Sequence, residues 1–440
     1  MTRGLSRFVL IAAAIGAVFP RSAAAGQGPE PERWTLARCR EEALAASRAL
    51  AARERAVDRA DAAAREAVAV SRPRLAFGGS YQHTSETMML DLPSFGGFVP
   101  PEVRFGDGNT YDFKLDLSAP LFTGGTLLSQ RRAGEAAARA SRHALAAESL
   151  RLSREVRRAY YAALGAGARA EAAGVAEERL RRHTGDVEAA AGVGMASDEQ
   201  RVQALARLLQ AEQARIRTEA LARIARLDLG RLAGRPGEEI APSEDLDASL
   251  FQAGAPADTT VDARPELAAL SALVEQGAHL ERAAKGAYFP ALAAQAAYHH
   301  AKPGVDVIAN DWMQYGTVAL TVSWPIWEWG ARGERVRQAR AAGSALEDEE
   351  AELRRNLRSA LEAARVQLES AEDELDRAAE RVELENLRLA YARSRYREAA
   401  ASESDLLDAE DDLAAAEIDL VLARTGLRLA EAELLSCLGY

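Results

Sequence analysis

The sequence predicts a mixed α and β membrane protein made of two tandem copies of one unit, in which two strands precede a long helical hairpin. The run YDFKLDLSAPLF, residues 111–122, alternates apolar and polar side chains with the period of a strand. A constant shift of 205 residues carries Pro120 to Pro325 and Gly125 to Gly330 (325 − 120 and 330 − 125). Leucine recurs every seven residues near the C-terminus, which indicates a coiled coil.

The N-terminal segment, residues 1–25, has the features of a secretory signal peptide. Arg3 and Arg7 precede an apolar run from Phe8 to Phe19, and Ala23 to Ala25 supply small residues at the expected cleavage site. Beyond this segment, no stretch of about 20 apolar residues is long enough for a helix to span a bilayer. We therefore expect an exported protein without a transmembrane helix.

The composition favours long helices over a compact globular core. Hydrophobic residues make up 48% of the 440 residues, but many are alanines, which form helices well and add little side chain to a core. A net charge of −11 and the lack of a basic tract argue against a nucleic-acid partner. We find no grouping typical of a nucleophile with its base, no phosphate-binding loop and no zinc-ligand spacing. The sequence predicts no enzyme activity, no cofactor and no metal site.

The repeat divides the chain beyond the signal peptide into two units. Upstream of the first loop the matching shift is 217 rather than 205, and the difference of 12 (217 − 205) marks an insertion between residues 82 and 110 of the first copy. The predicted units are residues 26–234 and 264–440, joined by an acidic linker, 235–263, that we expect to wrap the outside of the helical part. Strands are expected at 74–83, 110–122, 291–300 and 313–327, and hairpin tips near residues 194 and 399.

The second copy carries an uninterrupted seven-residue repeat on both helices of its hairpin. On the first helix the repeat is Leu361, Leu368, Leu375, Val382, Leu389 and Tyr396, with Ala364, Ala371, Ala378 and Ala392 three places on. On the returning helix it is Leu406, Leu413, Leu420, Leu427 and Leu434, with Ala409, Ala416, Ala423 and Ala430. Such a pattern predicts a left-handed coiled coil, in which alanine lets the two backbones approach closely. An ordinary helical bundle is the alternative.

Four strands are too few to close a β-barrel, so strands that span a membrane must be pooled between chains. An open edge would leave backbone groups unpaired in lipid, and a dimer would supply eight strands and a trimer twelve. The lipid-facing residues would be Phe113, Leu115, Leu117, Val318, Leu320 and Val322. The lumen-facing residues would be Asp112, Lys114 and Asp116, since lysine in hydrocarbon costs roughly 2–4 kcal/mol. The alternative is an antiparallel sheet on a soluble core.

Several motifs together resemble the outer-membrane efflux protein family, typified by TolC. They are the strand ends SAPLFTGG at 118–125 and SWPIWEWG at 323–330, the turn Val193-Gly194-Met195, and DLLDA at 405–409. The resemblance implies a homotrimer with one twelve-stranded outer-membrane β-barrel, continued by a long periplasmic barrel of coiled α-helices.

The resemblance also implies a function, a cellular location and partners. The chain would be the passive exit duct of a tripartite efflux or secretion system in the bacterial outer membrane, with a periplasmic extension. A periplasmic membrane-fusion adaptor and an inner-membrane pump would dock on it. The rival class is a periplasmic coiled-coil adaptor or scaffold without a pore, which would not need strands with a lipid face. Neither the residues nor the resemblance selects a cargo or the type of pump.

Two aspartates are candidates for the narrowest part of the channel. Asp405 and Asp408 are three residues apart and share a helix face. Aligned with the family, they fall at the tunnel constriction, where three chains would form a ring of carboxylates that selects cations and raises some carboxylate pKa values. Alternatively, they belong to a solvated acidic face that includes Asp411 and Asp412.

The two hairpin tips are expected to serve as adaptor contact and gate. Val193, Gly194 and Met195 form a plausible adaptor-contact turn, in which glycine allows a backbone that other residues avoid. The family closes its gate with a tyrosine and with an arginine bonded to an aspartate on the adjacent hairpin. The corresponding residues are Tyr396, Ala401 and Gln200, so that bond is missing. Either other pairs, such as those available to Arg393 or Arg397, close the tip, or the resting channel is looser.

Four further residues invite a chemical interpretation. Cys39 and Cys437 are the only cysteines. They are compatible with a periplasmic disulfide, although their seam positions favour small core residues. His299 and His300 lie at a strand end, but two histidines without a third ligand are weak evidence for a metal site.

Overall fold

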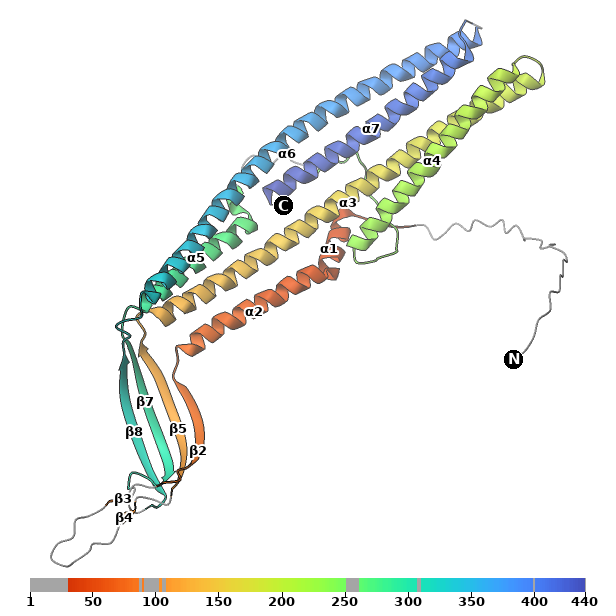
Figure 1. Cartoon of the computed structure of the whole chain (residues 1–440). Coiled ribbons are helices and arrows are strands. Elements are labelled where there is room, and N and C mark those ends of the chain that lie inside the picture. The colour runs from red at the N-terminus through yellow and green to blue at the C-terminus, as the bar shows by residue number, and fades with distance from the viewer. Residues whose placement is uncertain are drawn as a thin grey trace, which may run out of the picture.

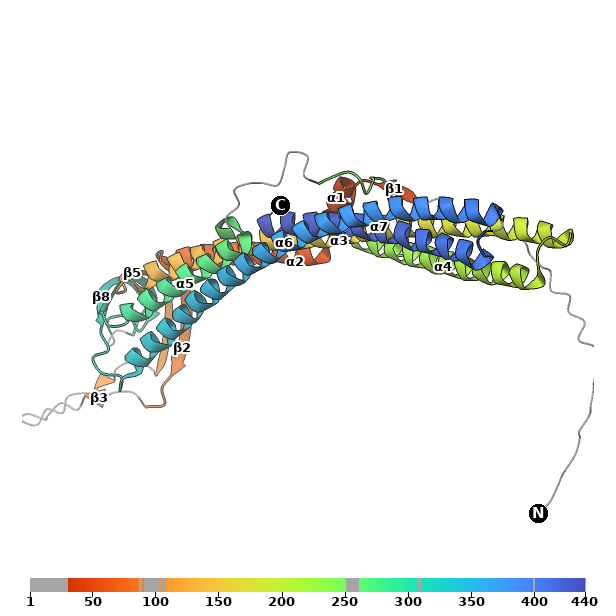
Figure 2. The same cartoon turned by 90° about the horizontal axis from the view of Figure 1, so that it is seen from above.

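The computed structural model describes residues 31–86, 89–90, 103–104, 108–250, 261–306, 310–398 and 400–439. The predicted signal peptide and residue 399, expected at the second tip, lie outside these ranges. The chain is strongly elongated, with a β-sheet at one end and two helical hairpin tips at the other (Figure 1). Seen at right angles, the helical part follows a gentle arc (Figure 2).

The sheet has four antiparallel strands, two from each copy of the repeat. The strands are β2 (Arg74–His83), β5 (Asn109–Phe122), β7 (Ala291–Lys302) and β8 (Met313–Ser323). Their order is β2-β5-β7-β8, so the two copies meet between β5 and β7. A short pair, β3 (Met89–Leu90) and β4 (Val103–Arg104), lies in the inserted loop. Within the chain, β2 and β8 each have one unpaired edge.

Three strand boundaries differ from the sequence-based ranges. β5 begins one residue earlier than expected and β7 ends two residues later. The expected strand 313–327 is too long, because β8 ends at Ser323. Pro325 has no N–H to donate to a ladder. Trp329 and Gly330, with φ of 52° and 83°, then turn the chain into the next helix.

The described ranges also contain seven α-helices. They are α1 (Leu36–Ala46), α2 (Arg48–Val70), α3 (Thr126–Gly192), α4 (Asp198–Leu232), α5 (Pro265–Gly286), α6 (Ala331–Arg397) and α7 (Glu403–Leu438), with a 3₁₀ turn at Val261–Ala263. The two longest, α3 and α6, have 67 residues each, and at 1.5 Å per residue each is about 100 Å long. They run from the sheet to the tips, while α4 and α7 fold back to the middle of the molecule (Figure 1).

The helix boundaries follow from short polar residues and glycines. Ser47 ends α1 and caps α2, which breaks the first helical segment in two. Ser197 and Ser402 begin α4 and α7 with capping boxes, each satisfying the free N–H groups of a first turn. Gly125 and Gly330 precede α3 and α6 in the left-handed conformation.

The predicted coiled-coil seam between α6 and α7 is confirmed. Near the tip, Leu389 packs with Leu406, Ala409 and Leu413. Further along, Ala371 packs with Leu427 and Ala430. Towards the middle the seam continues with Leu361, Ala364 and Leu434. Alternating leucine and alanine therefore brings these two helices into close contact over their shared length.

The main hydrophobic core lies midway along the helices. There β1 (Glu32–Trp34) pairs in parallel with β6 (Ile240–Pro242), across the face of α3. Buried aromatic and aliphatic side chains from these strands and from α1, α3, α4 and α7 form one cluster, including Trp34, Cys39, Val156, Tyr160, Tyr161 and Leu229. The linker thus begins as part of the core. None of the described helices is long and apolar enough to cross a bilayer.

Candidate functional site

The strand register divides the sheet into two chemically different faces. Directly paired residues of antiparallel strands point to the same side. Leu117 is paired with Leu75 and Ala296, and Ala296 with Val318. One face therefore carries the expected lipid-facing residues together with two more from β2: Leu75, Phe77, Phe113, Leu115, Leu117, Val318, Leu320 and Val322. All of them are exposed.

The opposite face carries the polar residues. Asp112, Lys114 and Asp116 lie on it, beside His299 of β7, which is the register partner of Lys114. The Nδ1 atom of His299 lies 3.0 Å from a carboxylate oxygen of Asp112, and its ring stacks on Tyr315 of β8. His299 thus joins three strands on this face. His300 lies on the apolar face instead, stacked on Trp312.

The loop end of the apolar face is rich in aromatic rings. Tyr81, Tyr111 and Trp312 lie in a row, with ring centroids 5.0 and 5.8 Å apart. Trp312 also stacks on Phe113. At the helix end, the indole N–H of Trp324 donates to the carbonyl of Tyr288 at 3.2 Å. Aromatic residues thus border the apolar face at both ends.

We call α3 with α4 the first hairpin and α6 with α7 the second. The tip of the first hairpin is a tight turn with exposed apolar side chains. Gly194 has a φ of 77°, and the N–H of Met195 donates to the carbonyl of Ala190 at 2.8 Å. This closes the end of α3 as glycine-containing helix ends commonly do. Val193 and Met195 are 73% and 83% exposed, so the turn presents two apolar side chains to the surroundings.

Gln200 and Asp405 hold equivalent places at the two tips. They are related by the repeat shift (405 − 200 = 205), and each closes a capping box. Gln200 accepts the N–H of Ser197 at 2.8 Å. Asp405 accepts the N–H and hydroxyl of Ser402 at 2.9 and 2.8 Å, which holds the pKa of Asp405 below its ordinary value. Asp405 is exposed, and Gln200 is half-buried.

Asp408 is part of a charge cluster that joins the two hairpins. Arg207 of α4 donates to Asp408 at 3.1 Å and also pairs with Asp411 on α7. Burial raises the pKa of Asp411, as do the neighbouring acids, while Arg207 acts in the opposite direction. Asp405 and Asp408 both lie on the exposed side of α7, but the charge of Asp408 is offset by an arginine of the same chain.

Two further contacts between the hairpins were missed by sequence reasoning. The Nε2 atom of His183 on α3 lies 3.4 Å from a carboxylate oxygen of the buried Glu403 on α7. Arg179 on α3 donates to both carboxylate oxygens of Glu417 at 2.9 and 3.0 Å. The sequence did contain a signal for such pairs, because α3 and α4 are rich in arginine and α7 is rich in acidic residues. The spacing of residues within one helix does not show which arginine meets which acid on another helix.

In the described part of the chain, the expected gate residues Tyr396, Gln200 and Ala401 form no hydrogen bond between the hairpins. Tyr396 packs in the seam of its own hairpin, and its ring lies 6.4 Å from that of His183. Burial raises the pKa of Tyr396, as does the charge of Glu403. Ala401 is half-buried just before Ser402. Of the proposed substitutes, Arg393 pairs with Glu410 within the second hairpin at 3.1 Å, and Arg397 donates to the carbonyl of Arg393.

A cavity of about 600 Å³ separates the two tips. His183, Met195, Arg393, Tyr396 and Glu410 are among the residues that line it. One carboxylate oxygen of Glu410 is buried without a hydrogen-bond partner. The hairpins are therefore joined near their tips by a few polar contacts around a hollow and by one apolar cluster of Leu180, Leu208 and Leu407, whereas the seam within the second hairpin is packed with leucine and alanine along its length.

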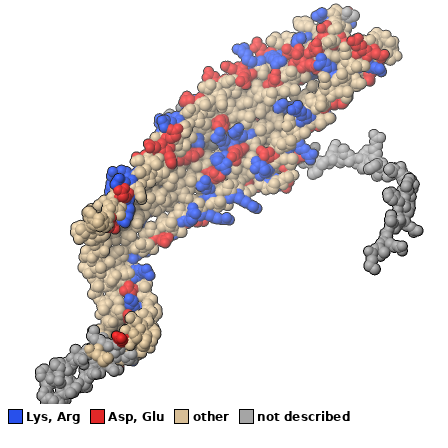
Figure 3. All heavy atoms as spheres, in the orientation of Figure 1, with Lys and Arg blue, Asp and Glu red and all other residues tan. Residues whose placement is uncertain are grey.

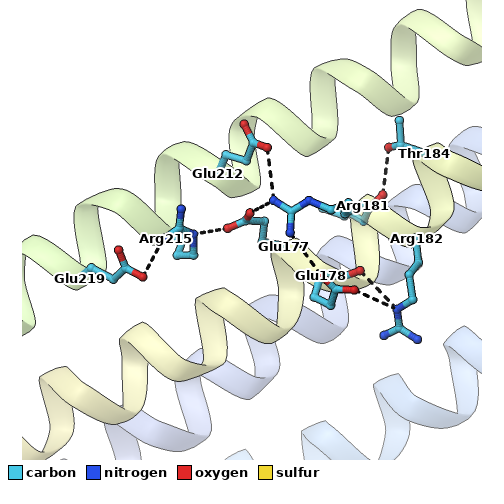
Figure 4. Close-up of polar contacts among 9 residues, drawn as sticks. Glu177, Glu178, Arg181, Arg182, Thr184, Glu212, Arg215 and Glu219 are labelled. Atoms are coloured by element: carbon cyan, nitrogen blue, oxygen red, sulfur yellow. Dashed lines mark hydrogen bonds and ion pairs between the residues drawn. The ribbon is translucent and has the colours of Figure 1, made fainter. Parts of the chain in front are cut away.

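The first hairpin has its own buried ion network (Figure 4). Glu177 of α3 is buried between Arg181 of the same helix and Arg215 of α4, and both arginines donate to it. Loss of water raises the pKa of Glu177, but these bonds outweigh that effect and leave the pKa below its ordinary value. Thr184, one turn further, donates to carbonyls of both helices. Polar bonds thus supplement apolar packing between α3 and α4.

The two cysteines are free, and they belong to different clusters. Cys39 is fully buried in the central core, where burial raises the pKa of its thiol to about 11. Cys437 is half-buried beside Leu361 and Leu434. Among the described residues, no three His, Cys, Asp or Glu side chains are grouped as a metal site requires.

Several solved structures have the same fold at low sequence identity. CusC, a protein that forms a transmembrane channel, has a TM-score of 0.80 at 19% identity, with 95% of each chain covered. The outer membrane protein VceC of Vibrio cholerae has a TM-score of 0.77 at 17% identity, covering 92% of this chain and 96% of its own. The open-state outer membrane channel MtrE of Neisseria gonorrhoeae has a TM-score of 0.75 at 20% identity, covering 92% and 88%.

The family assignment comes from the sequence itself. No curated protein sequence matches the chain significantly. The family model described as outer membrane efflux protein matches residues 39–235 and 258–440, which correspond to the two copies of the repeat. The chain therefore belongs to the outer membrane efflux protein family.

Proposed function

We propose that three copies of this chain form one channel through the outer membrane, and that it passively conducts substrates delivered from the periplasm or from an inner-membrane pump. The observation that carries the proposal is the two-faced sheet with unpaired edges at β2 and β8. Backbone groups at such edges need partners inside a bilayer. Pairing β8 of one copy with β2 of the next would be antiparallel, like every other pair in the sheet.

Three sheets joined in this way make a twelve-stranded barrel. The apolar face, with Phe113, Leu115 and Val318, would meet lipid, and the polar face, with Asp112 and Lys114, would line a water-filled lumen. An even number of strands with this alternation is the rule for bacterial outer-membrane barrels. The 67-residue helices would continue the wall into the periplasm for about 100 Å.

The hairpin tips are the proposed docking and gating end. Exposed Val193 and Met195, presented by Gly194, are suited to contact a periplasmic adaptor. Tyr396, Gln200 and Ala401 occupy the gate region, but the polar links that we propose to keep it closed are Arg207 with Asp408 and Asp411, His183 with Glu403, and Arg179 with Glu417. All of them join α7 to the first hairpin. Separating the hairpins would break them.

The test is the oligomeric state and conductance of the full-length protein extracted in detergent. Light scattering should give a protein mass three times that of one chain, and the same particle should produce ion-conducting steps in a planar bilayer. A monomeric particle, or a trimer without conductance, would contradict the proposal. The second outcome would favour the rival interpretation as a periplasmic scaffold.

Cation selection at the tips depends chiefly on Asp405 in this proposal. Arg207 offsets the charge of Asp408, whereas Asp405 accepts only neutral donors, and its lowered pKa keeps it ionised at physiological pH. Asp405→Asn keeps an acceptor for the capping box and removes the charge, so the cation-to-anion permeability ratio should fall towards one. Gln200→Glu adds a charge at the equivalent tip position and should raise the ratio. Unchanged reversal potentials in both variants would refute this assignment.

A further inference from the structure

The segment between β8 and α6, residues 324–329, exposes an unusual concentration of large apolar side chains. We call it the tryptophan loop; its sequence is WPIWEW. The side chains of Ile326, Trp327 and Trp329 are 79%, 72% and 89% exposed. Single exposed apolar residues are normal, but a cluster of them indicates a surface that is covered by something else.

The tryptophan loop is held in place by polar contacts on its inner side. Arg332, in the first turn of α6, donates to the carbonyl of Ile326 at 2.9 Å and pairs with Glu328 at 3.0 Å. Its guanidinium lies 5.3 Å from the ring centroid of Tyr288. Trp324 is tied to the carbonyl of Tyr288 by its indole N–H. These contacts fix the backbone of the loop, and the side chains of Ile326, Trp327 and Trp329 remain exposed.

The backbone at Trp329 shows that the exposed indole has a conformational cost. Its φ is 52°, a left-handed conformation that bulky residues avoid. The equivalent residue of the first copy is Gly124 (329 − 205), with a φ of 62°. There a Cβ atom would overlap the carbonyl oxygen of Gly286, so only glycine fits. The second copy leaves this position open and fills it with the largest side chain, which stands edge-on to Trp327 with ring centroids 5.8 Å apart.

The position of the loop identifies what covers it. Val318, Leu320 and Val322 follow one another at two-residue steps on the apolar face of β8, and the loop begins where that face ends. From Trp312 to Trp324 the strand covers about 40 Å, which at the usual tilt of roughly 35–45° spans about 30 Å, the thickness of a bilayer core. Figure 3 shows Lys and Arg side chains close to the place where the sheet meets the helices. One basic residue there is Arg335 of α6, which pairs with Glu328 of the loop.

We propose that the tryptophan loop is a lipid anchor, in which the Trp327 and Trp329 indoles lie in the headgroup layer of the periplasmic leaflet of the outer membrane. Indoles favour this layer because an apolar ring meets lipid while its N–H stays hydrated. The occupant is phospholipid, because the loop continues the face that meets lipid in the barrel. This inference rests on the proposed function, and it fixes how deep the barrel sits in the bilayer.

The test measures tryptophan fluorescence of the full-length protein in liposomes of phosphatidylethanolamine and phosphatidylglycerol. The acyl chains carry bromine either near the headgroup, at carbons 6 and 7, or deep, at carbons 11 and 12. The emission that Trp329→Asn removes is assigned to Trp329, and asparagine suits this position because it tolerates the left-handed conformation. We expect shallow bromine to remove at least twice as much of this emission as deep bromine, and aqueous iodide to remove little.

Two controls separate the inference from the proposed function. Flotation with the liposomes and ion conductance must first show insertion; if they do not, the proposed function itself fails. Met195→Trp places an indole at the far tip, and its added emission should respond to iodide but not to brominated lipid. If inserted protein conducts but Trp329 is quenched by iodide alone, or by neither agent, the anchor is refuted. Quenching by neither would mean that protein rather than lipid covers the loop.

Discussion

At the residue scale, one hydroxyl group holds the linker against the helical core. Tyr160 of α3 is fully buried. Its hydroxyl donates to the carbonyl of Trp34 at 3.1 Å and accepts the N–H groups of Ser243 and Glu244, both at 3.2 Å. The N–H of Ser243 also donates to the carbonyl of Trp34 at 2.9 Å. The hydroxyl therefore completes a three-way contact, and it is the acceptor shown for the N–H of Glu244. The segment between the two copies is anchored on the first copy by this contact.

We predict that Tyr160→Phe destabilises the protein by about 1–3 kcal/mol, because the N–H of Glu244 loses its acceptor and keeps its desolvation cost, whereas the N–H of Ser243 keeps the carbonyl of Trp34. The thermal unfolding temperature of the detergent-extracted protein should fall, and protease should cut more readily between residues 240 and 250. Tyr161→Phe is the matched control. Tyr161 is equally buried and stands edge-on to Tyr160, but no described backbone N–H donates to its hydroxyl. Equal effects of the two substitutions would contradict this account.

Residue-scale partners were the part that sequence reasoning could not supply. The spacing of Asp405 and Asp408 indicated a shared helix face, but Arg207 lies 201 residues from Asp408 along the chain. No periodicity relates the two. The sequence showed that the residues of the family's arginine–aspartate bond are missing. For the same reason, it did not show that His183 lies next to Glu403. Long-range pairing of charges depends on how two hairpins are rotated against each other.

At the element scale, the crossing of α3 and α7 depends on a glycine. A Cβ atom added to Gly165 would overlap the side chain of Thr425, whose hydroxyl is bonded to the carbonyl of Val421 at 2.7 Å. Gly167 lies two residues further along α3. A Cβ atom added there meets no described atom of a neighbouring element within 4 Å. The two glycines therefore differ in contact, although both lie inside a helix.

We predict opposite effects of alanine at these two positions. Gly165→Ala should destabilise the protein by about 1–3 kcal/mol through overpacking. Gly167→Ala should stabilise it by up to about 1 kcal/mol, because alanine is the better helix former. The measurement is the unfolding temperature of each variant, followed by circular dichroism. A rise for both would show that α3 and α7 do not approach each other as closely as the structure indicates.

The polar links between hairpins lead to a prediction about the gate. Removing Arg179 and Arg207 together breaks contacts that join α3 and α4 to α7. Three partly exposed pairs are lost in each chain. Each contributes about 1 kcal/mol at most, so the ratio of open to closed states should rise by up to roughly a hundredfold per chain. Single-channel recording of Arg179→Ala combined with Arg207→Ala should show more open time.

Arg388→Ala is the matched control for the gate. Arg388 also pairs with an acid of α7, Asp412, but it lies on α6 in the same hairpin. Its removal takes away one positive charge, against two in the double variant, without loosening one hairpin from the other, so the open time should stay close to that of the wild type. If Arg388→Ala opens the channel as much as the double variant does, the effect is one of net charge rather than of the links.

Elements were more predictable than contacts, because they are set by local patterns. The seven-residue repeat indicated the α6–α7 seam, and the period of two together with the internal repeat indicated all four strands. The error at the end of β8 has a physical cause: Trp324 and Ile326 continue the alternation, but Pro325 cannot pair and the chain turns at Trp329. The core around Trp34 could not be predicted, since it is assembled from short segments of both copies without a shared period.

At the scale of the whole molecule, the single chain has the form of one subunit of an oligomer. Its sheet has two free edges and two exposed faces, and Figure 1 shows it projecting beyond the helices. A sheet of this kind is not stable alone in water or in lipid. The faces and edges make sense together only if neighbouring copies complete the sheet and lipid covers the apolar side.

The assignment of faces can be tested with two adjacent residues of β8. Val318 lies on the apolar face, and Thr317 lies on the polar face with Ala297 as its register partner. If the apolar face meets lipid, Val318→Lys places a charge in hydrocarbon at a cost of about 2–4 kcal/mol per chain near the midplane, whereas Thr317→Lys places it in water. The first variant should therefore lose most of its heat-modifiable oligomer in outer-membrane extracts, and the second should keep it. Because the two positions are neighbours on one strand, a general effect on strand formation would disable both variants alike. Loss of the oligomer in Thr317→Lys alone would mean that the sheet is turned over, with the carboxylates of Asp112 and Asp116 facing away from the pore.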